Sequence, residues 1–155
     1  KTVFLIESQE AFQGVLEKAA AFERTGQSGF LIQEYIPLQY RTLRVVIIGT
    51  RIVSYWRVQE NSESFQSSLA SGAFIDADSD PDLQAKAGAA VEDFCKKTGI
   101  NLAGFDFLFS ESEERIRTPL FLEINYFFGR RGLGGSEEFY NLLDTEIKKW
   151  IDHLN

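Results

Sequence analysis

The sequence predicts an α+β fold, in which an antiparallel sheet has helices packed on one of its faces. Segments of strand length that are rich in Val, Ile and Phe alternate with longer segments whose apolar residues recur at helical spacing. The strand-like segments come in neighbouring pairs, and this order favours hairpins over parallel strands joined by helices. A length of 155 residues suits one domain, and 14 phenylalanines indicate an aromatic-rich core.

The first part of the chain predicts one helix between two strands. Residues 3–6 have the composition of a short buried strand. Ser8 is placed to cap a helix that runs to about residue 25, because apolar residues recur on one face until Gly26. Residues 30–36, with the sequence FLIQEYI, resemble a second strand that ends at a proline.

The next part predicts a hairpin followed by a loop. Residues 42–48 and 51–58 are two apolar strands separated by Gly49 and Thr50, which have the composition of a tight turn. Residues 59–72 are polar and rich in serine, and we expect a loop there.

The second half predicts two helices around a second pair of strands. One helix has Pro81 at its first position and Gly99 just past its end. Residues 101–109 and 120–127 are strand-like, and Ser136 is expected to cap a final helix. The apolar faces expected for these two helices consist of Leu83, Ala87, Ala90, Val91, Phe94 and Cys95, and of Phe139, Leu142, Leu143, Ile147, Trp150 and Ile151.

Composition excludes several classes of function. Sixteen basic against 23 acidic residues give a net charge of −7, which disfavours nucleic-acid binding. Cys95 is the only cysteine, so the sequence offers no internal disulfide and favours a reducing, cytoplasmic compartment. His153 is the only histidine, which argues against Ser-His or Cys-His catalysis. We find no apolar run of membrane-spanning length and expect no membrane partner.

Polar residues interrupt the last two predicted strands. Alternation places Glu123 and Asn125 on one face of their strand, and Asp106 faces away from the phenylalanines beside it. If the two strands pair, these three side chains meet on one face and offer oxygen ligands suited to Mg²⁺ or Mn²⁺. The alternative is that they simply face solvent on the open side of an antiparallel sheet.

The segment GRRGLGG follows the last strand and precedes the final helix. Arg130 and Arg131 lie there between glycines, so guanidinium groups and helix-start N–H groups together could bind a phosphate or a carboxylate. The alternative is a solvated turn that needs glycine for its backbone angles. The segment matches neither a Walker A loop nor a dinucleotide-binding fingerprint.

The order of segments along the chain resembles a known family. FLIQEYI, RTLRVVIIG, VSYWRV, FQSSLASG, LAGFDFLF and LFLEINYFFG follow one another as they do in the C-terminal half of ATP-grasp ligases, and the RimK-like glutamate ligase branch is the most similar. The resemblance covers roughly residues 1–152 and implies the C-terminal ATP-grasp subdomain as the fold.

The resemblance also implies roles for single residues. The hinge segment that contacts adenine and ribose would consist of Gln33, Glu34, Tyr35 and Ile36. The phosphates or an acyl phosphate would be faced by Arg44 and Arg57, and the metal ligands would be Asp106, Glu123 and Asn125. Glu123 is the ligand expected to bridge two ions.

Four features depart from the family pattern. Ser67 and Ser68 stand where the family usually has an asparagine, and Arg41 or Thr42 replaces an aspartate before the arginine strand. GRRGLGG replaces a Ser-Pro-Gly-like turn. The N-terminal half of the family domain is missing, so residues 1–155 are interpreted as one domain that is a fragment of a longer chain.

The predicted function is that of an ATP- and Mg²⁺-dependent ligase, which joins a carboxylate to an amine or thiol through an acyl phosphate. The partners would be a small-molecule or peptide carboxylate, an amine acceptor and the missing N-terminal half, and the oligomeric state is left open. The fragment alone is expected to be inactive. The alternative is a non-catalytic nucleotide-binding or structural module that retains the fold.

Overall fold

The computed structural model describes residues 3–24, 26, 29–36, 41–59, 73–109 and 118–154. The chain divides into two compact units, Lys1–Ile36 and Pro37–Asn155, and each is considered by itself.

The first unit contains one helix, α1 (Gln9–Glu23). The Ser8 hydroxyl accepts a hydrogen bond from the Ala11 N–H at 3.1 Å, which confirms Ser8 as the N-cap. The strands predicted at residues 3–6 and 30–36 do not form, since both segments lack regular secondary structure. Their apolar side chains are largely exposed, which shows that a hydrophobic sequence alone does not make a strand.

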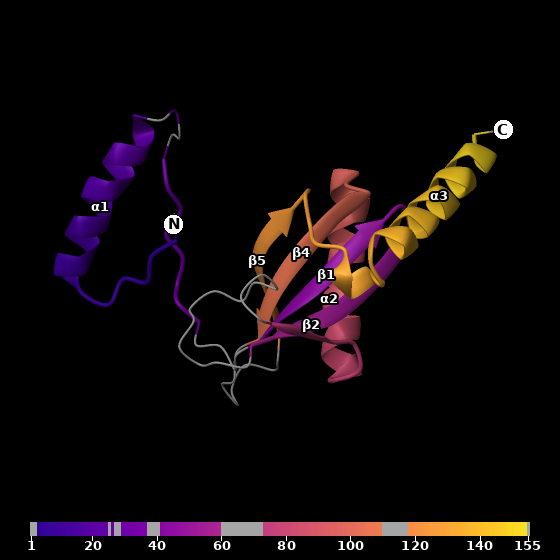
Figure 1. Cartoon of the computed structure of the whole chain (residues 1–155), viewed down its shortest axis with the longest axis horizontal. Coiled ribbons are helices and arrows are strands. Elements are labelled where there is room, and N and C mark those ends of the chain that lie inside the picture. Colours follow the sequence, from indigo (N-terminus) through magenta and orange to yellow (C-terminus); the bar gives the residue numbers. More distant parts are fainter. Residues whose placement is uncertain are drawn as a thin grey trace. The chain divides into compact units, whose positions relative to one another are not determined.

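The second unit is built on a five-stranded antiparallel sheet with the order β3-β2-β1-β4-β5 (Figure 1). The strands are β1 (Arg41–Ile48), β2 (Arg51–Val58), β3 (Phe74–Asp76), β4 (Leu102–Phe109) and β5 (Pro119–Asn125). The predicted hairpin is confirmed in β1 and β2, and the pair β4 and β5 is confirmed as well. The short strand β3 was not predicted. Nearly all of the expected loop at residues 59–72 lies outside the described residues, as do residues 110–117 between β4 and β5.

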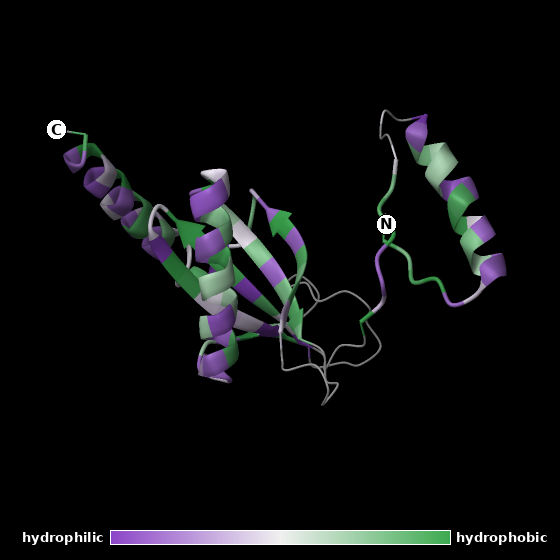
Figure 2. Cartoon of the chain, turned by 180° about the vertical axis from the view of Figure 1, so that it is seen from behind, coloured by the Kyte–Doolittle hydropathy of each residue, from purple (hydrophilic) through white to green (hydrophobic). Residues whose placement is uncertain are grey.

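One face of the sheet is covered by helix α2 (Pro81–Thr98). Pro81 opens the helix and Gly99 ends it with a φ of 75°, as the sequence predicts. The core of this layer consists of Leu43, Val45, Ile47, Trp56, Leu83, Ala87, Val91, Cys95, Ala103, Phe105 and Phe107. Figure 2 shows hydrophilic residues interrupting the otherwise hydrophobic strands of the sheet.

The opposite face carries a second, smaller core around Val46, Ile48 and Tyr55. The 3₁₀ helix η2 (Arg131–Leu133) and the start of helix α3 (Ser136–Asp152) cover it through Leu133 and Phe139. The α+β class and the antiparallel sheet are therefore confirmed, while the helices lie on both faces rather than on one. The helices η2 and α3 cover this second face because apolar side chains of the sheet point to it and, like those of α3, are stabilised by burial.

Helix α3 differs from its prediction in its N-cap and in part of its apolar face. Gly135 is its N-cap and Ser136 is the first helical residue, so Ser136 does not cap it. Its second half extends beyond the sheet (Figure 1), and Ile147, Trp150 and Ile151 are exposed. Among the described helices, none is long and apolar enough to cross a membrane.

Candidate functional site

The candidate site lies on the sheet face opposite α2, where four neighbouring strands place polar side chains side by side. Cross-strand pairing sets Arg44 of β1 opposite Asp106 of β4, and Asp106 opposite Glu123 of β5. A register shift between Asp106 and Phe107 gives β5 one extra residue, Leu122, in a β-bulge. The bulge keeps Glu123 beside Asp106 while Phe121 packs against the rings of the α2 layer.

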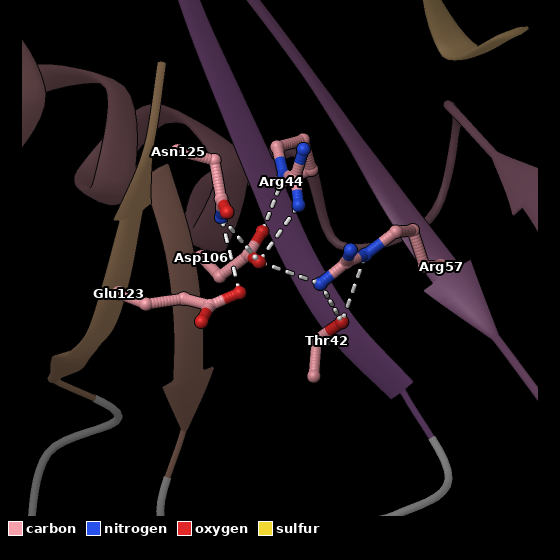
Figure 3. A network of polar contacts seen from close by, with 6 residues as sticks. All are labelled: Thr42, Arg44, Arg57, Asp106, Glu123 and Asn125. Atoms are coloured by element: carbon pink, nitrogen blue, oxygen red, sulfur yellow. Dashed lines mark hydrogen bonds and ion pairs between the residues drawn. The ribbon is translucent and has the colours of Figure 1, made fainter. Parts of the chain in front are cut away.

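Asp106 is the centre of a buried ion-pair network (Figure 3). Its side chain is fully buried, which would be very costly for an unpaired carboxylate. Arg44 meets it with a two-pronged contact, Nε to Oδ1 and Nη2 to Oδ2, the latter at 2.8 Å. Arg57 of β2 adds a third contact, from Nη2 to Oδ2 at 2.9 Å. Two guanidinium groups therefore compensate the carboxylate.

The pKa values of the two arginines shift in opposite directions, because Asp106 offsets the effect of burial fully for Arg44 and only in part for Arg57. Burial alone would lower the pKa of Arg44, but its hydrogen bonds to Asp106 and the charge of that carboxylate outweigh burial and raise the pKa. Burial lowers the pKa of Arg57, and the attraction of Asp106 offsets this only in part because Arg44 repels it. Arg57 is thus the less neutralised member of the pair.

Glu123 and Asn125 lie at the open edge of the network (Figure 3). The Asn125 amide Nδ2 donates to Glu123 Oε1 at 3.0 Å and approaches Asp106 Oδ2 at 3.4 Å. The three oxygen-bearing side chains predicted as metal ligands are therefore brought together. Glu123 is exposed to solvent, whereas Asp106 is enclosed by arginines.

These residues fit a divalent cation in the kind of donor they offer. A carboxylate has about four lone-pair sites, and among the described residues Asp106 Oδ1 accepts only from Arg44 Nε. Asn125 would present its oxygen after its amide turns over. No cluster of three or more His, Cys, Asp or Glu side chains that could hold a metal occurs in the described ranges, so such an ion would take two carboxylates and one amide.

The segment that carries the paired arginines packs on the same sheet face. A Cβ added to Gly132 would lie 2.2 Å from the Tyr55 ring, so η2 presses its backbone directly on that ring. Arg130 donates from Nη1 to the Tyr140 hydroxyl at 3.0 Å and to Ser136 Oγ at 3.5 Å. Its guanidinium also stacks on Phe139 and Tyr140, with centroid distances of 4.6 Å and 4.7 Å. Arg130 is therefore held in place, and Arg131 is exposed.

The remaining predicted residues lie elsewhere. The hinge segment of Gln33, Glu34, Tyr35 and Ile36 belongs to the first unit, where it has no regular secondary structure. Ser67 and Ser68 lie outside the described residues. Cys95 is buried on α2, as the sequence indicates.

Sequence reasoning missed two members of the site. Thr42 accepts hydrogen bonds from Arg57, and Tyr55 lies opposite Arg44 on β2 and packs its ring against Gly132 of η2. Burial raises the pKa of the Tyr55 hydroxyl. The available signal was alternation: Thr42 and Arg44 are two residues apart on β1 and so share a face.

Comparisons with known proteins give the family of the chain. The family model described as a RimK-like ATP-grasp domain matches residues 1–150. A "Probable alpha-L-glutamate ligase" of Pectobacterium carotovorum subsp. carotovorum (strain PC1) is 30% identical over 132 residues, which are 84% of this chain and 40% of that protein. The chain thus spans less than half the length of this relative.

A solved structure, the macrocyclase MdnB from Microcystis aeruginosa MRC, is 17% identical and covers 93% of this chain and 42% of its own, with a TM-score of 0.37. The family assignment rests on the sequence match over nearly the whole chain. The chain belongs to the RimK-like ATP-grasp family.

Proposed function

We propose that the full-length protein is an ATP-dependent ligase that joins a carboxylate to an amine or thiol, and that this chain supplies its phosphoryl-binding face. The observation that carries the proposal is the pair of buried arginines around Asp106, with Glu123 and Asn125 beside them. A buried guanidinium pair at the edge of two carboxylates is suited to the oxygens of a transferring phosphoryl group.

The proposed reaction has two steps. A carboxylate oxygen of the first substrate attacks the terminal phosphorus of ATP, and ADP leaves. The nitrogen or sulfur of the second substrate then attacks the acyl carbon, the bond from that carbon to the phosphate oxygen breaks, and phosphate departs with the electron pair. The nucleophile loses one proton to solvent. Both steps spread negative charge over phosphoryl oxygens, and catalysis is mainly positioning and charge stabilisation.

Each group of residues has a proposed task. Arg57 and Arg44 would stabilise the phosphoryl oxygens, and the hinge segment Gln33, Glu34, Tyr35 and Ile36 would contact adenine and ribose. Asp106, Glu123 and Asn125 would hold Mg²⁺ or Mn²⁺, which neutralises phosphate charge when bound.

Arg130 and Arg131 are proposed to bind a phosphate or a carboxylate of a ligand. The fixed guanidinium of Arg130 supports this role, because a preordered fork loses little entropy on binding. The name of the curated relative suggests L-glutamate as one substrate to test. A single cysteine and an ATP-consuming reaction fit a cytoplasmic location.

The proposal is tested by ADP release from the full-length protein with Mg²⁺, a panel of free and peptide carboxylates, and amine acceptors that include L-glutamate. Arg57→Gln should lower kcat by about 100-fold, as the loss of one charge-stabilising donor does elsewhere. Arg51→Gln is the matched control, since Arg51 is an exposed arginine on the same strand. Binding of ATP without turnover across the panel would instead support the non-catalytic module.

Glu123 is the sharper probe of the metal proposal. Asp106 holds two arginines, so any change there disturbs the network whether or not metal binds. Glu123→Gln leaves the contacts of Asp106 with Arg44 and Arg57 in place and should reduce the Mg²⁺ dependence of ATP binding in calorimetry. An unchanged Mg²⁺ dependence would contradict the assignment of Glu123 as a ligand.

A further inference from the structure

Thr42 holds one edge of Arg57. The Thr42 hydroxyl oxygen accepts from Arg57 Nε at 3.1 Å and from Arg57 Nη2 at 2.9 Å. The two residues face each other across β1 and β2, and Thr42 is only 1% exposed. The contact is therefore shielded from solvent, and it lies along one edge of the Arg57 guanidinium (Figure 3).

The contact with Thr42 does not neutralise the positive charge of Arg57, because a hydroxyl carries no charge. Arg44 and Arg57 are both buried and share one buried carboxylate, that of Asp106. Among the described residues, Arg57 makes one ion-pair contact with Asp106, and its other acceptor is the neutral hydroxyl of Thr42. Within the described part of the chain, the buried members of the network, Arg44, Arg57 and Asp106, therefore carry one excess positive charge, and the carboxylate of Glu123 at the edge of the network is exposed. Since the contacts of Arg57 there use Nε and Nη2, the N–H bonds of Nη1 remain for a ligand.

We propose that Thr42 is a positioning residue, which fixes Arg57 through a neutral acceptor so that the guanidinium presents Nη1 and an uncompensated positive charge to a phosphoryl group. This inference rests on the proposed function for the identity of the anion. It adds the reason why a hydroxyl serves here: a hydroxyl orients the arginine without cancelling its charge, whereas a carboxylate would do both.

The orientation is tested first, by a measurement that does not depend on activity. In the full-length protein, the NMR signal of the Arg57 Nε–H group, assigned with Arg57→Lys, is compared between wild type, Thr42→Val and Thr42→Ser. Valine keeps the branched shape and removes the acceptor, so the signal should shift and its proton should exchange faster. Serine should restore the wild-type signal, and the Arg44 Nε–H signal should stay unchanged in both variants. An unshifted Arg57 signal in Thr42→Val would overturn the proposal.

The consequence for turnover is tested next. Thr42→Val should lower kcat about tenfold, which is the usual size of one lost hydrogen bond to a charged group. Thr42→Ser should stay within about twofold of wild type, because the acceptor remains. A Thr42→Ser variant as slow as Thr42→Val would mean that bulk rather than the hydroxyl matters, and would overturn the proposal.

The charge is tested with Thr42→Asp, which keeps an acceptor for Arg57 and adds a negative charge. The Arg57 Nε–H proton should remain protected, while the dissociation constant for Mg²⁺-ATP in calorimetry should rise at least about threefold through the lost attraction. An unchanged or tighter dissociation constant would overturn the charge argument. If no carboxylate and amine give ADP release from wild type, the proposed function fails, and the NMR and calorimetry arms still decide the role of Thr42.

Discussion

At the scale of single residues, Asp106 explains why charged side chains lie inside a hydrophobic sheet. Its carboxylate is fully buried and is contacted by Arg44 and Arg57, so the two buried arginines share one carboxylate within the sheet face. The sequence indicated that Asp106, Glu123 and Asn125 share one face, and their hydrogen bonds agree with that. It did not indicate that the arginines reach Asp106, because pairing of β1 with β4 joins residues 62 positions apart.

Removing the charge of Asp106 should destabilise the fold. Asp106→Asn leaves two buried guanidinium groups without their carboxylate, and we expect a loss of about 3 kcal/mol in the free energy of unfolding. Glu123→Gln alters an exposed carboxylate on the next strand and should cost less than about 0.5 kcal/mol. Urea unfolding of both variants measures the difference. Equal losses would show that the Asp106 network contributes little to stability.

At the scale of elements, the sequence predicted most of the second unit because local signals there agree with long-range pairing. Gly49 and Thr50 mark the turn of the β1–β2 hairpin, and Pro81 and Gly99 mark the ends of α2. The segment at residues 30–36 has an equally apolar sequence but forms no strand. A strand needs a neighbour to satisfy its backbone, and no local pattern supplies that information.

The contact between η2 and the sheet depends on one glycine. Gly132→Ala would place its Cβ 2.2 Å from the Tyr55 ring, so the turn or the ring must move. We expect a loss of about 2 kcal/mol in unfolding free energy, together with lower activity, as overpacking usually gives. Gly129→Ala is the matched control, since no heavy atom lies within 4 Å of its added Cβ. Thermal unfolding of the pair tests the contact, and identical melting would argue against it.

Helix α3 is tied to the β1–β2 turn by Glu146. Its buried carboxylate pairs with Lys149 and accepts from the Thr50 N–H and hydroxyl, both at 2.8 Å. The hydrogen bonds to Lys149 and Thr50 lower the pKa of Glu146 from 4.5 to about 2. The close approach also requires Gly49, where an added Cβ would lie 2.7 Å from Glu146.

This tie should make stability depend on pH. The pKa of Glu146 is lower in the folded state, so its contribution is complete above about pH 4.5 and is lost as the pH falls toward 2. Glu146→Gln should cost about 1–2 kcal/mol at pH 7, and the difference from wild type should shrink at pH 3. Asp152→Asn, which alters an exposed carboxylate of the same helix, is the control. Urea unfolding at the two pH values tests this; a pH-independent difference would contradict it.

At the scale of the whole molecule, the residues proposed to bind the nucleotide belong to both compact units, and each unit is considered by itself. The residues expected to contact adenine lie in the first unit, and the arginine network lies in the second. The chain spans 40% of the length of its curated relative. Its family could be identified from the order of six short segments, whereas nothing in that order names a substrate.

Binding by this chain alone should therefore be weak. In calorimetry with Mg²⁺-ATP, we expect residues 1–155 to bind at least about tenfold more weakly than the full-length protein, because each lost phosphate contact reduces affinity by about that factor. Arg57→Gln in the full-length protein is the reference, since it gives the change in dissociation constant when one phosphate contact is lost. Equal affinities would show that the described face suffices for the nucleotide.

The β-bulge at Leu122 has a consequence for how this family can vary. Pairing with β4 fixes Glu123 and Asn125 after the bulge, so the register at the site does not depend on the number of residues that join the two strands. We therefore expect changes of length between β4 and β5 to leave the register at the site unchanged, and we expect a deletion at position 122 to give regular pairing in place of the bulge. A length change between Glu123 and Asn125 would turn one of them to the opposite face. An alignment of relatives should show gaps in the first two places and none in the third.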